Sequence, residues 1–285
     1  MNEFFVHYFF NFINQSILET LSYQSENFNP INRAFLYGDA VTVFFFVKEG
    51  QLILAEESYF FLMASMRKLR LNIPLSYTLE FFQNLFANEV IAKGYNDAII
   101  RFQVFRATHE LGKASTKAEV AFYFEAVPSK VLELKEAIDV DVIKEVFLSN
   151  SLLNNIRVHC AENTYAEIYA SENDLDDVIL LNYNKRIARG IYGNYLLLEG
   201  NTVKVPPYTE GAYISPLLES FVTFLDKNNL ALISETELSS FETQKAEEIL
   251  MVSDEKGLFP VKKIRNKTFE HTKFAEWITQ WNNSI

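Results

Sequence analysis

The order of apolar and polar residues in the first part of the chain predicts strands followed by two helices. Strands are predicted over residues 4–12, 16–21 and 40–47, and the last of them ends in a Lys-Glu-Gly turn at 48–50. Residues 56–70 predict a helix, because Tyr59, Leu62, Met63 and Met66 recur at the spacing of one helical face. Ser76 is the predicted N-cap of a second helix that continues to residue 92.

Further along the chain the pattern mixes strands and helices without strict alternation. The predicted strands are 98–107, 119–126, 178–181, 195–198, 202–205 and 247–252, and the predicted helices are 151–170, 215–227 and 272–282. Pro128 and the charged residues after it predict a domain boundary near residue 127. We therefore expect an α+β fold with a small N-terminal α/β domain, residues 1–126, and a larger C-terminal domain, residues 127–285.

Composition and charge exclude several classes of protein. The chain has 285 residues, of which 49% are hydrophobic and 22% charged, so wholesale disorder is excluded. Its 26 Phe and 14 Tyr against 9 Gly indicate a sheet-rich core. The net charge is −11 and no basic stripe offsets it, so we expect no nucleic-acid partner.

Cysteine usage and hydropathy bear on the compartment. Cys160 is the single cysteine, so an internal disulfide is excluded and a reducing compartment is expected. No apolar run reaches the length that spans a membrane, and the apolar N-terminus lacks the basic residues of a signal peptide. These features predict a cytoplasmic protein that has no membrane partner.

The common catalytic motifs are missing from the sequence. There is no dinucleotide-binding Gly-x-Gly-x-x-Gly, no phosphate-binding Gly-x-x-x-x-Gly-Lys-Ser/Thr and no nucleophile elbow Gly-x-Ser-x-Gly. The histidines, His7, His109, His159 and His271, are scattered and do not pair with each other or with cysteine at metal-ligand spacing. We therefore expect no metal site.

An ordered set of segments resembles the class IV aminotransferase family. The segment Arg-Ala-Phe-Leu-Tyr-Gly-Asp-Ala-Val at 33–41 resembles the family's Arg-x-x-x-x-Tyr-Gly-Asp-Gly-Val. The later segments that match in order and spacing are 176–182, 193–196, 205–212 and 246–261. The family comprises fold-type IV pyridoxal-phosphate enzymes: branched-chain aminotransferase, D-amino-acid aminotransferase and 4-amino-4-deoxychorismate lyase. The resemblance implies two domains, a cofactor cleft between them and a homodimer.

The resemblance also locates the residue that would carry the cofactor. The family's lysine opens Lys-Thr-x-Asn-Tyr-Leu-Asn-Asn-Ile, and the Leu-Asn-Asn-Ile at 153–156 matches the end of that motif, which puts Leu148 at the lysine. An internal aldimine needs a primary amine, which leucine lacks. Lys144 is the nearest substitute. On a strand it would share the face of Leu148, but about 13 Å away along the strand.

The family's phosphate and ring contacts are also replaced. A helical His-x-x-Arg pair corresponds to Tyr59 and Leu62, and the Gly-Ile-Thr at a helix N-terminus corresponds to Ser215, Pro216 and Leu217. The last phosphate contact, a threonine, corresponds to Asp254, whose carboxylate would repel a dianion.

The glutamate that faces the pyridine nitrogen corresponds to Arg189. Together these replacements predict that no cofactor is bound, although pyridoxal phosphate is the family's cofactor.

Two functions follow from these observations. The first is a homologue that has lost the pyridoxal-phosphate site and acts as a non-catalytic binding or interaction protein. The alternative is an active pyridoxal-phosphate-dependent lyase or aminotransferase that uses a lysine at another position. Under the first, Leu62, Leu148 and Leu217 fill the former cofactor cleft, or Arg189 serves as the single cationic group of a remodelled pocket for a small anionic metabolite. Arg101 and Arg106 are predicted on opposite faces of their strand, where one of them could face the cleft.

Overall fold

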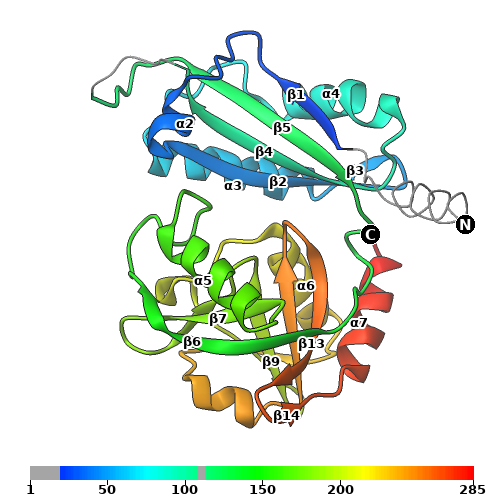
Figure 1. The fold of residues 1–285 in the computed structure, drawn as a ribbon. Coiled ribbons are helices and arrows are strands. Elements are labelled where there is room, and N and C mark those ends of the chain that lie inside the picture. The colour runs from blue at the N-terminus through cyan, green and yellow to red at the C-terminus, as the bar shows by residue number, and fades with distance from the viewer. Residues whose placement is uncertain (1–19, 108–112) are drawn as a thin grey trace, which may run out of the picture.

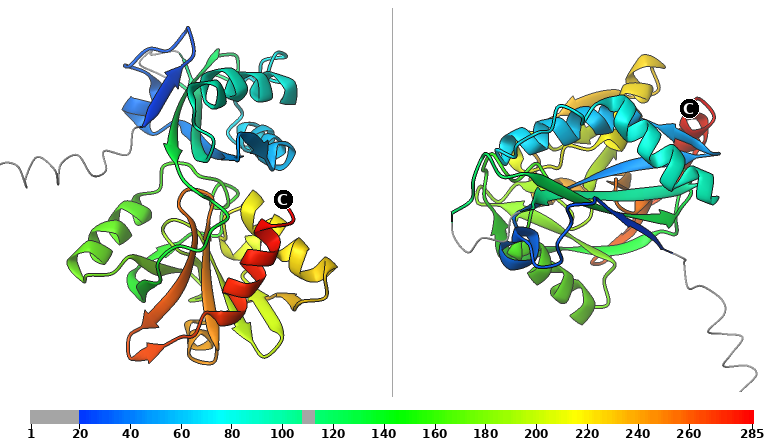
Figure 2. Two further views of the ribbon diagram at one scale, coloured as in Figure 1. Left: turned by 90° about the vertical axis from the view of Figure 1, so that its right-hand side faces the viewer. Right: turned by 90° about the horizontal axis from the view of Figure 1, so that it is seen from above.

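The structure is a computed structural model, and it describes residues 20–107 and 113–285. The strands predicted over 4–12 and over most of 16–21, and His7 and His109, lie outside the described residues. Two sheets lie one above the other, and the chain passes from the first to the second after β5 (Figures 1 and 2). Helices and strands are mixed in both parts, which confirms the predicted α+β class.

The first sheet is antiparallel throughout, in the order β1-β5-β4-β2-β3. Its strands are β1 (Leu21–Gln24), β2 (Ala40–Lys48), β3 (Gln51–Ile53), β4 (Ala98–Arg106) and β5 (Val120–Pro128). The helices of this part are α2 (Arg33–Tyr37), α3 (Ala55–Lys68) and α4 (Leu79–Glu89), followed by the 3-10 turn η1 (Ile91–Lys93). Because β5 continues to Pro128, the strand passes the boundary predicted at residue 126, and the domain division stays a prediction.

The second sheet is mixed, in the order β11-β10-β9-β12-β13-β6-β7-β8, with β14 paired to β13. Its strands are β6 (Ile138–Leu148), β7 (Asp177–Asn182), β8 (Ile187–Arg189), β9 (Asn194–Glu199), β10 (Thr202–Val205), β11 (Leu232–Glu235), β12 (Glu248–Ser253), β13 (Gly257–Ile264) and β14 (Lys267–Thr268). The helices are α5 (Ala161–Glu172), α6 (Pro216–Lys227) and α7 (Thr272–Asn282), with 3-10 turns η2 (Tyr208–Glu210) and η3 (Ser240–Gln244). None of the helices in the described ranges is long and apolar enough to cross a membrane.

Strand β2 is buried on both of its faces, which explains its uninterrupted apolar run. Val43 and Phe45 point into a cluster beneath α3 and α4, whereas Phe44 and Phe46 point into a cluster built with α6 and α7. Side chains alternate between the faces of a strand, so β2 belongs to two cores at once. Its other apolar residues, Val41 and Val47, join the first cluster.

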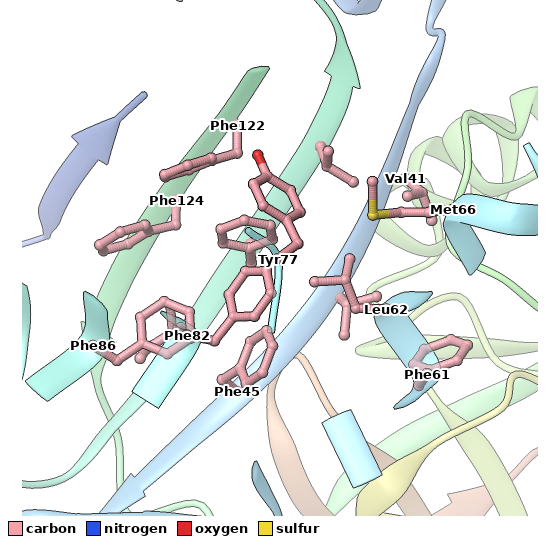
Figure 3. Packing of buried hydrophobic residues seen from close by; sticks show 14 of the residues in the cluster. Val41, Phe45, Phe61, Leu62, Met66, Tyr77, Phe82, Phe86, Phe122 and Phe124 are labelled. Carbon is pink, nitrogen blue, oxygen red and sulfur yellow. The ribbon is translucent and has the colours of Figure 1, made fainter. Parts of the chain in front are cut away.

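The core between the first sheet and its helices is rich in aromatic rings. Phe45 lies 4.8 Å from Phe86 between ring centroids, and Phe102 lies 5.4 Å from Phe82 in an edge-to-face arrangement. Figure 3 shows Phe45, Phe82 and Phe86 in the same cluster as Leu62 and Met66 of α3. The helical stripe predicted from Tyr59, Leu62, Met63 and Met66 is confirmed at its last three positions, which are buried.

Two helix starts differ from the predictions. The N-cap of α4 is Thr78, whose hydroxyl accepts from the Phe81 N–H, and not Ser76. Residues 152–155 form a turn and residues 156–160 are not helical, so the helix predicted over 151–170 begins only at Ala161. The reason is local: the Ser149 and Ser151 hydroxyls both donate to the side-chain oxygen of Asn154, which offers the backbone an alternative to a helix.

Candidate functional site

A cleft of about 590 Å³ lies between the two sheets. The first sheet contributes Thr42, Arg101 and Gln103 to its wall, from neighbouring strands β2 and β4. The second part contributes residues from the turns around α5 and from the segment before α6, among them Arg157, His159, Cys160, Asn163, Tyr192 and Tyr213. The cleft therefore depends on both sheets for its shape.

Basic side chains line this cleft, and no lysine is among its described lining residues. Arg101 is exposed into the cleft and has no ion-pair partner among the described residues. Arg106 lies on the opposite face of β4, as predicted, and pairs with Asp39 at 2.5 Å. Arg157 pairs with Glu255 at 3.2 Å and donates to the Tyr192 carbonyl.

Tyr213 stands between two guanidinium groups. The guanidinium carbon of Arg157 lies 4.2 Å from the centre of the Tyr213 ring, and that of Arg189 lies 4.0 Å from it. Each contact is a cation–π interaction, worth about 2 kcal/mol when the cation is desolvated. Tyr213 lines both the large cleft and a smaller cavity, with Arg157 in the wall of the first and Arg189 in the wall of the second. This arrangement was not predicted, because the three residues are distant in sequence and no motif links them.

The smaller cavity, which we call the inner cavity, has a volume of about 230 Å³. Leu148 and Arg189 line it, and His159, Cys160 and Tyr213 belong to its wall and to that of the large cleft. Leu148 at the end of β6 is 1% exposed and Arg189 at the end of β8 is 2% exposed. Arg189 is the one arginine or lysine among the described lining residues of the inner cavity, whereas Arg101 and Arg157 line the large cleft, so its role as the single cationic group of a ligand pocket stays a prediction.

The N-terminus of α6 holds a buried carboxylate. One oxygen of Asp254 accepts from the Ser215 hydroxyl at 2.7 Å and from the Leu217 N–H at 3.2 Å. Ser215 is the N-cap, and its hydroxyl oxygen accepts from the Leu218 N–H, while Pro216 occupies the first helical turn. Burial raises the pKa of Asp254 to about 6, although the Ser215 hydroxyl, the Arg157 guanidinium and the Leu217 N–H favour the charged form.

A second buried carboxylate lies deeper in the same part. Asp177 at the start of β7 accepts from the backbone N–H groups of Val178, Ile191 and Tyr192. Burial raises the pKa of Asp177 to about 6 as well, against the effect of these three hydrogen bonds. The carboxylate fixes the turn that carries Ile191 and Tyr192 into the wall of the large cleft.

The three leucines expected to fill one cofactor cleft lie in three different places. Leu62 belongs to the core beneath the first sheet, Leu217 to the core of α6 and α7, and Leu148 to the core beside α5. That prediction is wrong, since only Leu148 lines a cavity of the candidate site. Tyr59, the other residue of the replaced helical pair, donates its hydroxyl to the Tyr77 carbonyl.

Lys144 and Leu148 do not share a face of β6, contrary to the prediction. The pairing of β6 with β7 shifts in register between Val142 and Phe147, so the alternation of side chains is interrupted between the two residues. Lys144 is exposed and lines a separate cavity of about 530 Å³ beside η3 and β14, whereas Leu148 is buried. Lys144 is therefore not part of the candidate site.

The fold is shared with several solved structures. A branched-chain aminotransferase from Thermoproteus uzoniensis, solved with norvaline, has 14% identity and a TM-score of 0.82 over 93% of this chain and 94% of its own. A putative 4-amino-4-deoxychorismate lyase from Legionella pneumophila has 16% identity and a TM-score of 0.79 over 92% and 96%. A hypothetical aminotransferase from Mycobacterium tuberculosis has 14% identity and a TM-score of 0.77 over 90% and 92%. These likenesses confirm the predicted fold-type IV architecture.

The expectation that no cofactor is bound is contradicted by these comparisons. The Mycobacterium tuberculosis protein was solved in its pyridoxal-phosphate-bound form. A family model described as amino-transferase class IV also matches this chain. The expectation was wrong because it inferred the absence of a cofactor from replaced contacts alone.

The contacts found here nevertheless differ from those that the resemblance implies for this cofactor. The donors at the N-terminus of α6 are taken by Asp254, and no described lining residue of the cleft or the inner cavity is a lysine. These residues do not fit a covalently held pyridoxal phosphate with its phosphate at that helix.

The sequence itself places the chain in a family. A family model described as amino-transferase class IV matches residues 42–264. That range includes strands of both sheets and all the residues of the inner cavity. Since the match covers most of the chain, this protein belongs to the class IV aminotransferase family.

Proposed function

We propose that this member of the class IV aminotransferase family is a non-catalytic protein that binds a small organic anion in the cleft between the two sheets. The observation that carries the proposal is the chemistry of the lining, which combines Arg101, Arg157 and His159 and includes no lysine among the described residues. An internal aldimine forms only on a primary amine, so the lining supports binding better than transamination.

Charge favours an anionic ligand. The chain as a whole carries a net charge of −11, whereas the cleft lining sets Arg101 and Arg157 against Glu167 and Glu255, so the cleft is less acidic than the chain as a whole. Arg101 extends into the cleft without an ion-pair partner among the described residues, whereas Arg157 is neutralised by Glu255. An incoming carboxylate or phosphate would gain a charge-assisted hydrogen bond from Arg101.

Pyridoxal phosphate is the first anion to test, because it is the cofactor of a structural neighbour. What the proposal excludes is not the binding of pyridoxal phosphate but the formation of an aldimine with a lysine of the protein. A pyridoxal phosphate held without a covalent bond would still be a bound anion, but it would not enter the aldimine exchange on which a transaminase depends.

The test is borohydride reduction of the purified protein after incubation with pyridoxal phosphate, followed by peptide mapping and a visible absorbance spectrum. We expect no stoichiometric adduct on any single lysine and no absorbance band of an aldimine. A protein that turns yellow and carries one reduced adduct, on Lys144 or on another single lysine, would refute the proposal in favour of an active lyase or aminotransferase. A Lys144→Arg variant is the control for the lysine that the sequence predicts as the substitute, since it keeps the charge and removes that primary amine.

The anion itself is tested separately by thermal unfolding. We expect pyridoxal phosphate or inorganic phosphate to raise the Tm of the protein, and an Arg101→Gln variant to reduce that rise. A homodimer and a cytoplasmic location remain parts of the proposal that follow from the sequence, through the family resemblance and the single cysteine.

A further inference from the structure

The cavity that Lys144 lines, which we call the basic cavity, differs in charge from the chain as a whole. Its volume is about 530 Å³, and it shares no lining residue with the large cleft. Three basic residues line it, Lys144, Arg265 and Lys267, and none of its described lining residues is Asp or Glu. In a chain with a net charge of −11, such a lining favours an anionic ligand.

Two of the three basic side chains have unused hydrogen-bond donors. Lys144 is exposed and makes no side-chain hydrogen bond or ion pair with the described residues. Arg265 pairs with Asp141 through Nε at 2.9 Å, while its Nη1 and Nη2 donate to no described residue. A phosphate can therefore accept from both side chains without displacing an existing contact.

The third basic side chain, Lys267, is held in place beside η3. Its ammonium group donates to the carbonyls of Gln244 and Ala246, each at 2.6 Å, and lies 4.9 Å from the centre of the Phe269 ring. These partners are uncharged, and one of the three ammonium N–H groups has no oxygen partner. Partial burial lowers the pKa of Lys267, and a bound anion would oppose that shift.

An exposed aromatic ring and two free amides line the same cavity. Phe241 in η3 is 68% exposed, and Nζ of Lys245 lies 6.0 Å from the centre of its ring. Such a ring can stack on a heterocyclic base, since every base has a π-face. The side-chain amides of Gln244 and Asn266 make no hydrogen bond with the described residues, so they can pair with the hydroxyl groups of a sugar.

Charge and volume limit the ligand to one nucleotide. Three cations against the carboxylate of Asp141 leave two positive charges, which match the dianion of a phosphate monoester. Glu242 of η3 accepts from the Ser239 N–H and hydroxyl, and Lys245 on the same turn offsets its charge. The volume lies within the range of about 300–1,000 Å³ that is typical of small-molecule pockets.

We infer that the basic cavity binds a nucleoside monophosphate, with the base on Phe241 and the phosphate beside Lys144 and Lys267. Arg265 supplies further donors to the phosphate. The inference goes beyond the proposed function and does not rest on it, because the two sites share no residue. The binding is reversible and involves no covalent step.

The test measures how adenosine 5′-monophosphate (AMP) protects Lys144 of the full-length protein from acetylation by acetic anhydride, with peptide mapping to assign each lysine. Lys227, which is exposed at the end of α6, is the reference in the same sample. Adenosine lacks the phosphate and ribose 5-phosphate lacks the base, so they are the matched control ligands. AMP bound in the large cleft would leave Lys144 unprotected, since no described lining residue of that cleft is a lysine.

We expect AMP to slow the acetylation of Lys144 and to leave that of Lys227 unchanged. Adenosine and ribose 5-phosphate should need concentrations at least about fivefold higher for the same protection. Phe241→Ala and Arg265→Gln should each raise the half-protecting AMP concentration at least about fivefold. Both replaced side chains are exposed, so the variants should fold.

The matched control variant is Phe60→Ala. It removes a 58% exposed ring from α3 that lines neither the basic cavity nor the large cleft, so it should leave the protection of Lys144 by AMP unchanged.

Three outcomes would overturn the inference. They are equal effects of AMP on Lys144 and Lys227, protection by adenosine as strong as that by AMP, and protection by ribose 5-phosphate that equals that of AMP and is unchanged in Phe241→Ala. None of them bears on the proposed function, which is judged by borohydride reduction and by the Tm of Arg101→Gln. AMP carries no aldehyde, so its effect on Lys144 does not depend on an aldimine.

Discussion

Replacing Asp254 with asparagine is the change that most directly tests the electrostatics at the start of α6. Asp254 is 2% exposed and takes its hydrogen bonds from Ser215 and Leu217. The groups that face it are Arg157, which favours the charged form, and Glu219, which opposes it. Burial is the largest influence, so the folded protein holds a proton on this carboxyl more tightly than the unfolded chain does.

The magnitude follows from the raised pKa. The pKa of Asp254 rises from the ordinary 3.8 to about 6, which is about two units. Each unit corresponds to about 1.36 kcal/mol, so the free energy of unfolding changes by about 3 kcal/mol. Because the folded state binds the proton more tightly, this stability is fully present below pH 3.8 and is lost as the pH rises through about 6.

Asparagine does not ionise, so the free energy of unfolding of Asp254→Asn does not fall as the pH rises through the pKa of Asp254. Relative to the unmodified protein, the variant should gain about 3 kcal/mol between about pH 4 and about pH 8. Part of the gain at the upper end is offset, by about 1 kcal/mol, because a neutral amide accepts weaker hydrogen bonds than a carboxylate. Asp177 has a similarly raised pKa and is unchanged, so the variant keeps the pH dependence that Asp177 causes.

The assay is urea unfolding across that pH range, followed by the fluorescence of Trp277 and Trp281, which are buried in α7. Asp226→Asn, an exposed aspartate on the same helix, is the matched control and should leave the pH profile unchanged. A stability difference between Asp254→Asn and the unmodified protein that stays constant with pH would refute the reasoning. It would mean that solvent or Arg157 compensates the burial of the carboxylate.

Three further changes are tested by the same urea unfolding. Phe45→Ala should cost about 3–5 kcal/mol, because the ring is 0% exposed, whereas Phe35→Ala, at 75% exposure, should stay within about 0.5 kcal/mol; equal costs would contradict the described core. Asp39→Asn should cost about 3–5 kcal/mol, because it leaves two mostly buried arginines without their shared carboxylate, and a cost below about 1 kcal/mol would show that solvent reaches them. Gly38→Ala should cost at least about 1–2 kcal/mol, since Gly38 has φ +64° and an added Cβ would lie 2.7 Å from the His159 Cβ; a second change, His159→Gly, which removes that Cβ, should recover part of the cost and not add to it.

The parts of the fold that depend on local periodicity could be predicted from the sequence. The stripe of α3 and the run of β2 were recognised, and α7 has the predicted bounds, 272–282. The segment 151–160 was misassigned, because side-chain hydrogen bonds among Ser149, Ser151 and Asn154 compete with a helix and leave no mark on the apolar pattern.

For the candidate site, the sequence could identify individual residues but not which of them are in contact. Alignment by motif identified Leu148, Arg189, Ser215 and Asp254 one at a time, and the structure brings Ser215 and Asp254 into contact across 39 positions of sequence. The register shift in β6 separates Lys144 from Leu148, which no rule of alternation anticipates. The stacking of Tyr213 between two arginines depends on three distant turns, so it required the tertiary structure.

Tyr213 forms part of the wall of both the large cleft and the inner cavity, as Val158, His159 and Cys160 also do, and its ring links the arginines of the two spaces. A ligand that moved this ring aside would give up two cation–π contacts, one with Arg157 and one with Arg189. A smaller side chain at residue 213 would therefore remove both contacts at once and leave Arg157 and Arg189 without the ring that now lies between them.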